Sequence, residues 1–99
     1  MSTSDIATLE KLQSRVARPV RFELNGERCI ALDLTADDYI WSGLIRHHSN
    51  DEKQEILELV CRLKELKRLN LRRNKLGLLP ESFSELTELE QLNLGSNHL

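Results

Sequence analysis

A stretch of eleven residues occurs twice in this 99-residue chain, 23 positions apart. LKRLNLRRNKL at 66–76 aligns with LEQLNLGSNHL at 89–99, and six of the eleven positions are identical. An amphipathic helix needs apolar residues at a period of about 3.6, but it needs no asparagine at a fixed place. The repeat instead predicts a stack of similar units, each of which buries its apolar side chains against its neighbours.

The spacing inside the repeat predicts a short strand. Leu69 and Leu71 are two apart, so they point to the same side of a strand, while Leu66 and Leu76 lie in the adjoining bends. Asn74 follows the strand, where a buried amide can donate to and accept from unpaired backbone groups, one coil to the next. The repeat positions are Leu66, Leu69, Leu71, Asn74, Leu76, Leu89, Leu92, Leu94, Asn97 and Leu99.

The pattern LxxLxLxxNxL, followed by xxLPxxFxxL, resembles the leucine-rich repeat in its 23-residue form. A weaker unit, CIALDLTADDY, has Cys29, Leu32, Leu34, Asp37 and Tyr39 at the five motif positions. The resemblance implies an α/β fold, a right-handed solenoid with short parallel strands on its concave side and helices or loops on its convex side. It also implies an N-terminal α/β cap.

Two helices and a hairpin are expected before the regular repeat. Ser4 and Asp5 can cap a helix with an apolar stripe of Ile6, Leu9, Leu12 and Val16, and Pro19 ends it. Asn25-Gly26 offers the two positive-φ positions of a tight turn between two antiparallel strands. Ser49 and Glu52 have capping-box spacing and predict a helix over 50–65, with Ile56, Leu57, Val60, Leu63 and Leu66 as its stripe.

These elements divide the chain into four segments. Residues 1–28 are expected to form the N-terminal cap and 29–65 an irregular first repeat with a long convex helix. Residues 66–88 are one regular repeat, and 89–99 are the strand half of another. Because each coil of such a fold needs a neighbour, we expect a fragment of a longer protein, or self-association through the uncapped C-terminal coil.

The residues between the leucines are expected to project onto the concave face, which the resemblance implies is the partner-binding face. They are Ala31, Asp33, Thr35, Arg68, Asn70, Arg72, Gln91, Asn93 and Gly95. Arg73 and Lys75 border this face on the adjoining turn. Two interpretations stay open: a positive patch for an acidic protein segment or a phosphate, or solvated charges partly paired with Asp33 and the downstream glutamates.

Composition and motifs argue against other classes of function. The formal net charge is -2, and no apolar run approaches the length of a membrane span. We therefore expect a cytoplasmic protein, and we do not expect nucleic acid as its main partner. Cys29 and Cys61 form no CxxC pair, and with His47 and His48 they match no zinc spacing. Tyr39 and Trp41 are expected to pack where the first unit meets its neighbour.

The resemblance implies a protein-interaction module, and from the motifs we expect no enzyme, no metal, no cofactor and no catalytic residues. No phosphate-binding loop or nucleophile elbow occurs. One alternative is that the chain is the N-terminal targeting or autoinhibitory segment of a larger signalling enzyme, such as a GTPase, kinase or ubiquitin ligase. A less favoured one is binding of a phosphate-bearing or nucleic-acid ligand through the basic residues from Arg68 to Lys75.

Overall fold

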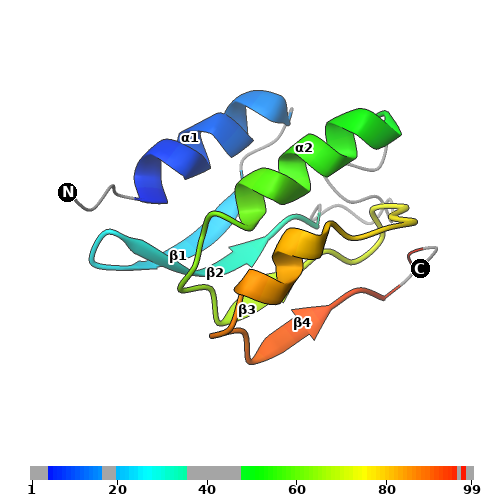
Figure 1. The fold of residues 1–99 in the computed structure, drawn as a ribbon. Coiled ribbons are helices and arrows are strands. Elements are labelled where there is room, and N and C mark those ends of the chain that lie inside the picture. Colours follow the sequence, from blue (N-terminus) through cyan, green and yellow to red (C-terminus); the bar gives the residue numbers. More distant parts are fainter. Residues whose placement is uncertain (1–4, 17–19, 36–47, 96, 98–99) are drawn as a thin grey trace.

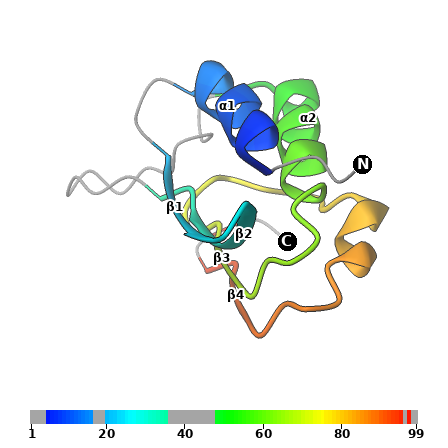
Figure 2. The same cartoon turned by 90° about the vertical axis from the view of Figure 1, so that its left-hand side faces the viewer.

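The computed structural model describes residues 5–16, 20–35, 48–95 and 97, which form one four-stranded sheet with helices on one side (Figures 1 and 2). In chain order the elements are helix α1 (Asp5–Arg15), strands β1 (Arg21–Asn25) and β2 (Arg28–Asp33), helix α2 (Asn50–Val60), strand β3 (Arg68–Asn70), the 3-10 helix η1 (Glu81–Glu85) and strand β4 (Gln91–Asn93). The strand order is β1-β2-β3-β4. The β1–β2 pair is antiparallel, and β2, β3 and β4 are parallel to one another.

Helix α1 confirms most of its predicted stripe. Leu9 and Leu12 are buried, but Ile6 is 44% exposed, so its assignment to the inner stripe is wrong. Asp5 is buried instead: its carboxylate accepts a hydrogen bond from the Cys29 backbone N–H at 2.8 Å. The first turn of α1 thus contacts the sheet through a polar group, and this contact turns Ile6 toward the surface. Ser4 lies outside the described residues.

The hairpin turn lies one residue later than predicted. Asn25 pairs with Arg28, so Gly26 and Glu27 form the turn. In the described chain Gly26 is the only glycine with a positive φ, at 65°, and Asn25 keeps the extended conformation of the strand. A single left-handed position therefore suffices here, and glycine occupies it.

A bulge in this hairpin places Cys29 and Leu32 on the same face of β2. Glu23 pairs with Ala31 but Leu24 pairs with Cys29, so Ile30 is an extra residue in β2. The bulge reverses the alternation of side chains, and Cys29 and Leu32 both become buried although they are three positions apart. It also accounts for the sequence pattern, in which Cys29 and Leu32 otherwise belong to opposite faces of one strand.

Helix α2 begins as predicted and ends earlier. Ser49 and Glu52 form the reciprocal capping box, since the Ser49 hydroxyl accepts from the Glu52 N–H at 3.1 Å and the Glu52 carboxylate accepts from the Ser49 N–H at 2.9 Å. The helix stops at Val60 rather than near residue 65. Tighter turns follow, with Leu63 N–H donating to the Val60 carbonyl and Leu66 N–H to the Leu63 carbonyl. These turns keep Leu63 and Leu66 buried while the chain changes direction toward β3.

The strand pairing matches the sequence alignment of the repeat. Leu32 pairs with Leu69, and Leu69 pairs with Leu92. Leu69 is 2% exposed and Leu92, on the outermost strand β4, is 41% exposed. The core is continuous beneath the helices, with Leu86 buried and Leu79, Phe83, Leu89 and Leu94 packed against it. Leu99 lies outside the described residues.

The turn after β3 is held by two asparagines. Asn74 is fully buried, and its Nδ2 donates to the carbonyl of Leu71 at 3.0 Å and to that of Arg72 at 3.3 Å. The bonds to the next coil come from Asn97, whose Oδ1 accepts from the N–H groups of Asn74 and Leu76, each at 3.0 Å. Asn74 thus shapes its own turn, and Asn97 joins that turn to the following unit.

Candidate functional site

The predicted surface residues lie on the side of the sheet opposite α1 and α2, in three rows that run across the strands. Register places Ala31 beside Arg68 and Gln91 in one row, and Asp33 beside Asn70 and Asn93 in the next. Thr35, Arg72 and Gly95 lie two residues further on, beyond the strand ends, where the N–H of each is bonded to a side chain of the second row. We call the surface formed by these nine residues the open face.

The middle row has a structural role that the sequence prediction missed. Asp33 accepts a hydrogen bond from the Thr35 N–H at 2.8 Å and one from the Thr35 hydroxyl. In the same way, Asn70 Oδ1 accepts a hydrogen bond from the Arg72 N–H at 3.1 Å, and Asn93 Oδ1 accepts one from the Gly95 N–H at 2.9 Å. Each side chain thus satisfies a backbone group two residues ahead, where the strand ends. The local signal was present, because Asp or Asn occupies the same place in all three units.

Arg68 is paired with a residue that was not among the candidates. Its guanidinium donates to the Glu23 carboxylate at 2.6 Å, across the intervening strand β2. Ala31 lies between them, since it pairs with Glu23 on one side and with Arg68 on the other. Its methyl group is short enough for the two long side chains to meet above it. The expected pairing with Asp33 or downstream glutamates is therefore wrong for Arg68.

Arg72 differs from Arg68 in its surroundings. It is exposed, and within the described residues no acidic side chain forms an ion pair with it. Gly95 lies beside it: a Cβ at Gly95 would be 3.6 Å from both Cγ and Nε of Arg72, an ordinary van der Waals contact, and 3.1 Å from Oδ1 of Asn93. The side chain of Arg72 thus lies beside the end of β4, at the residue whose N–H is bonded to Asn93.

Arg73 and Lys75 occupy the turn after β3, as predicted, and both have a left-handed backbone. Their φ angles are 64° and 56°, a conformation that side chains other than glycine adopt uncommonly. Lys53 of α2 supports this turn, because its Nζ donates to the Lys75 carbonyl at 3.0 Å. Burial, with a smaller effect from the Lys75 cation, lowers the pKa of Lys53. Lys53 was not predicted to be buried, and it fixes the turn against α2.

The open face contains a hollow of about 500 Å³ that reaches all four strands. Its lining includes the Glu23–Arg68 pair, the amides of β3 and β4, and the apolar residues Phe22, Leu32, Leu69 and Leu92. The hollow therefore offers charged and amide groups beside apolar ones to a ligand.

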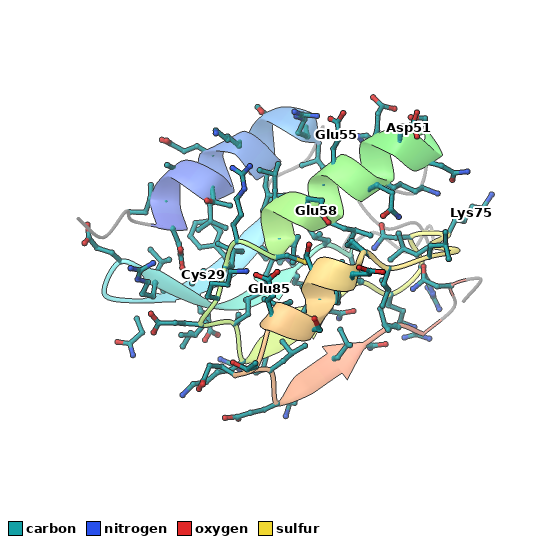
Figure 3. All side chains as sticks on the ribbon, in the orientation of Figure 1. Cys29, Asp51, Glu55, Glu58, Lys75 and Glu85 are labelled. Atoms are coloured by element: carbon teal, nitrogen blue, oxygen red, sulfur yellow. The ribbon has the colours of Figure 1, made fainter. Side chains whose placement is uncertain are left out.

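The helical side of the molecule has a different character. Figure 3 shows Asp51, Glu55 and Glu58 projecting from α2, with Glu85 on η1 and Lys75 at the far end of the structure. Glu55 forms an ion pair with Arg15, and Glu85 forms one with Lys64. Ser82 donates to the Glu58 carboxylate at 3.1 Å. These acidic groups join α1, α2 and η1 to one another.

The other candidate groups form no site in the described residues. Burial raises the pKa of the thiols of Cys29 and Cys61 to about 11, and both are free thiols. His48 Nε2 lies 2.7 Å from the Arg15 carbonyl oxygen, so this histidine contacts α1 rather than lying free on a loop surface. No group of metal-ligating side chains is found in the part of the chain described. Tyr39, Trp41, His47 and Asp37 lie outside it.

No helix among the described residues is long and apolar enough to cross a membrane.

Comparison with known proteins identifies the repeat. Residues 59–99 match the family model of the leucine rich repeat. No curated protein and no solved structure matches the chain. Domains with such repeats are generally protein-interaction modules and are typically not enzymes. The matched segment includes β3 and β4, whose leucines pair in register in a mixed α/β structure with parallel strands. Residues 59–99 are thus similar in sequence to the leucine rich repeat family.

Proposed function

We propose that this chain is a protein-binding module whose open face contacts its partner. The observation that carries the proposal is the arrangement of residues between the repeat leucines, six of them in register across β2, β3 and β4, on a side of the sheet that no described helix covers. The opposite side is packed against helices, and there Glu55, Glu58 and Glu85 are bonded to neighbouring elements. The open face thus offers polar groups from three strands to a second protein.

The architecture that we propose is a short solenoid, with residues 1–28 as its N-terminal cap. In this proposal residues 29–65 are the first, irregular unit, 66–88 the regular unit, and 89–99 the first part of the next. The β1–β2 hairpin supports the cap assignment, because the antiparallel pairing ends at β2 and parallel pairing begins there. The partner-binding residues would be Asp33, Thr35, Arg68, Asn70, Arg72, Gln91 and Asn93, with Arg73 and Lys75 at the rim.

A cytoplasmic protein partner suits this surface better than a nucleic acid. Arg68, one of the four basic residues proposed as a patch, is neutralised by Glu23, and Asp33 adds a negative charge to the same face. Binding to nucleic acid depends on several unpaired cations that replace the counterions of the phosphates. The open face has a mixed charge, which is typical of protein surfaces that select a partner by complementarity.

A peptide selection tests the proposal. Peptides that bind the chain are selected from a random display library, and their binding to two double variants is then measured. Gln91→Glu with Arg72→Glu alters the open face, and Asn50→Glu with Arg62→Glu makes the same change of charge away from it. Gln91, Arg72, Asn50 and Arg62 are all exposed. We expect the selected peptides to lose binding to the first variant and to retain it with the second. The reverse result would place the binding surface elsewhere.

A further inference from the structure

We propose that the open face binds a side-chain carboxylate from an extended acidic segment of the partner protein, through Arg72 and the amide groups of Asn70 and Asn93. This inference rests on the proposed function and specifies the chemistry of the partner. Three properties of the strand ends support it: the orientation of two amides, the position of one arginine, and the charge of a neighbouring aspartate.

The two amides present only donors to a ligand. Asn70 Oδ1 and Asn93 Oδ1 each accept from a backbone N–H, so these oxygens are already engaged. Within the described part of the chain, no group accepts a hydrogen bond from Nδ2 of either residue. Asn70 and Asn93 are paired neighbours on adjacent strands, which lie about 4.8 Å apart. Two NH₂ groups at this separation suit a ligand that supplies acceptors.

Arg72 adds a cation beside these donors. Its N–H is bonded to Asn70 Oδ1, and its stem lies beside Gly95, whose N–H is bonded to Asn93 Oδ1. Its charge is uncompensated by any acidic side chain of the described residues, whereas Arg68 of the same coil is paired with Glu23. A planar guanidinium binds a carboxylate through two parallel hydrogen bonds, which are stronger than bonds between neutral groups.

Asp33 favours a carboxylate over a phosphate. It pairs with Asn70, so its charge is one strand away from the donors. The Coulomb energies of the ligand with Arg72 and with Asp33 are both proportional to the ligand charge and have opposite signs. The higher charge of a phosphate monoester, about −1.5 to −2 at neutral pH, therefore gains little net attraction here. The single guanidinium suits the single charge of an Asp or Glu side chain.

Nuclear magnetic resonance tests this inference directly. The ¹⁵N-labelled chain is titrated with a synthetic peptide in which Glu alternates with Thr, and with the peptide in which Gln replaces every Glu. We expect the Glu peptide to shift the side-chain NH₂ resonances of Asn70 and Asn93 and the Nε–H resonance of Arg72. The Gln peptide should leave them in place. No shift with the Glu peptide, or equal shifts with both peptides, would overturn the inference.

Two arginine variants provide the matched comparison. Arg72→Gln should weaken binding of the Glu peptide about tenfold, the loss expected for one charge-assisted hydrogen bond. Arg68→Gln removes an equal charge from the same coil, and it should change binding less than about twofold because Arg68 is already paired. Equal losses of binding in the two variants would mean that net charge alone attracts the peptide, and the proposed site would then be wrong. If a phosphoserine peptide or an oligonucleotide shifts these side-chain resonances more than the Glu peptide does, the proposal that the ligand is a carboxylate is wrong.

The peptide selection separates this inference from the proposed function. If the selected peptides need the open face but contain no common Asp or Glu, the chain is a protein-binding module and the carboxylate site is wrong. If they bind regardless of the open face, both proposals fail. Enrichment of acidic peptides that depend on Arg72 supports both.

Discussion

Arg68 of β3 donates a hydrogen bond to Glu23 of β1 at 2.6 Å although strand β2 separates their backbones. The pair is possible because Ala31, the residue between them, has the smallest side chain in its row. The contact leaves Arg72 as the arginine of the open face that has no acidic partner among the described residues.

This ion pair should contribute little to the stability of the protein. The side chains of Arg68 and Glu23 are 47% and 60% exposed, and exposed pairs typically contribute about 0.2 to 1 kcal/mol. A double-mutant cycle with Glu23→Gln and Arg68→Gln, measured by urea denaturation, should give a coupling energy in this range. A coupling of several kcal/mol would contradict the view that the pair mainly organises the surface.

Asn97 should protect the turn of the preceding coil. Its Oδ1 accepts from the N–H groups of Asn74 and Leu76, and its Nδ2 donates to the Leu71 carbonyl at 2.9 Å. In Asn97→Ala we expect faster hydrogen exchange at Asn74 and Leu76 and a loss of about 1 to 3 kcal/mol in the free energy of unfolding, because buried polar groups lose their partner.

Asn93→Ala is the control for the Asn97 variant. It removes an amide whose Oδ1 bonds to Gly95 at an exposed place. Exchange at Asn74 should stay unchanged in this control. Unchanged exchange in Asn97→Ala itself would show that the turn does not depend on that side chain.

The capping box of α2 should make stability depend on pH. Hydrogen bonds with the Ser49 backbone and side chain lower the pKa of Glu52 below its ordinary value of 4.5. A carboxyl group with a lowered pKa in the folded state stabilises the protein above its unfolded pKa, and this contribution is lost as the pH falls through the folded value. In Glu52→Gln, the loss of stability below about pH 4.5 should therefore be smaller than in the parent chain.

Ser49→Ala tests the same cap at neutral pH. It should reduce the free energy of unfolding by about 0.5 to 2 kcal/mol, the range for loss of an N-cap side chain. Ser84→Ala removes a serine that bonds to the Glu81 carbonyl at an exposed position, and it should have a smaller effect. Equal effects of the two alanine variants would be inconsistent with a special role of Ser49. Thermal unfolding followed by circular dichroism measures both.

The two thiols should be unreactive in the folded protein. Burial raises the pKa of Cys29 and Cys61 from 9.0 to about 11, and the thiolate is the reactive form. We expect a disulfide reagent at pH 8 to label both thiols in denaturant and neither in the native state. Because the folded pKa is raised, their contribution to stability is present below pH 9 and is lost as the pH rises toward about 11. Rapid native labelling would contradict the burial of these residues.

The repeat could be predicted from the sequence because its signal is local. The spacing of Leu66, Leu69 and Leu71 is the same in the next unit, and the period of two along a strand places the intervening residues on the other side. The strand pairing of Leu69 with Leu92 confirms the alignment. The same argument predicted which residues occupy the open face. Their role in partner binding stays a prediction.

Features that depend on contacts distant in the sequence could not be predicted in this way. Glu23 and Arg68 are 45 positions apart, and nothing in the local sequence of either residue indicates the other. The bulge at Ile30 accompanies the burial of both Cys29 and Leu32 against the helices, and the inward position of Asp5 accompanies its bond to Cys29. Helix α2 ends at Val60 because tighter turns lead into β3, although the apolar period continues.

The bonds of Asn97 also bear on how the chain acquires its structure during synthesis. The turn that follows β3 receives two of its hydrogen bonds from a side chain 23 positions beyond Asn74. A ribosome makes the chain from its N-terminus, so Asn74 emerges well before the residue that completes its turn. The unit that contains Asn97 thus completes the turn of the unit made before it. The turn after β3 has all of these hydrogen bonds only once Asn97 has been translated.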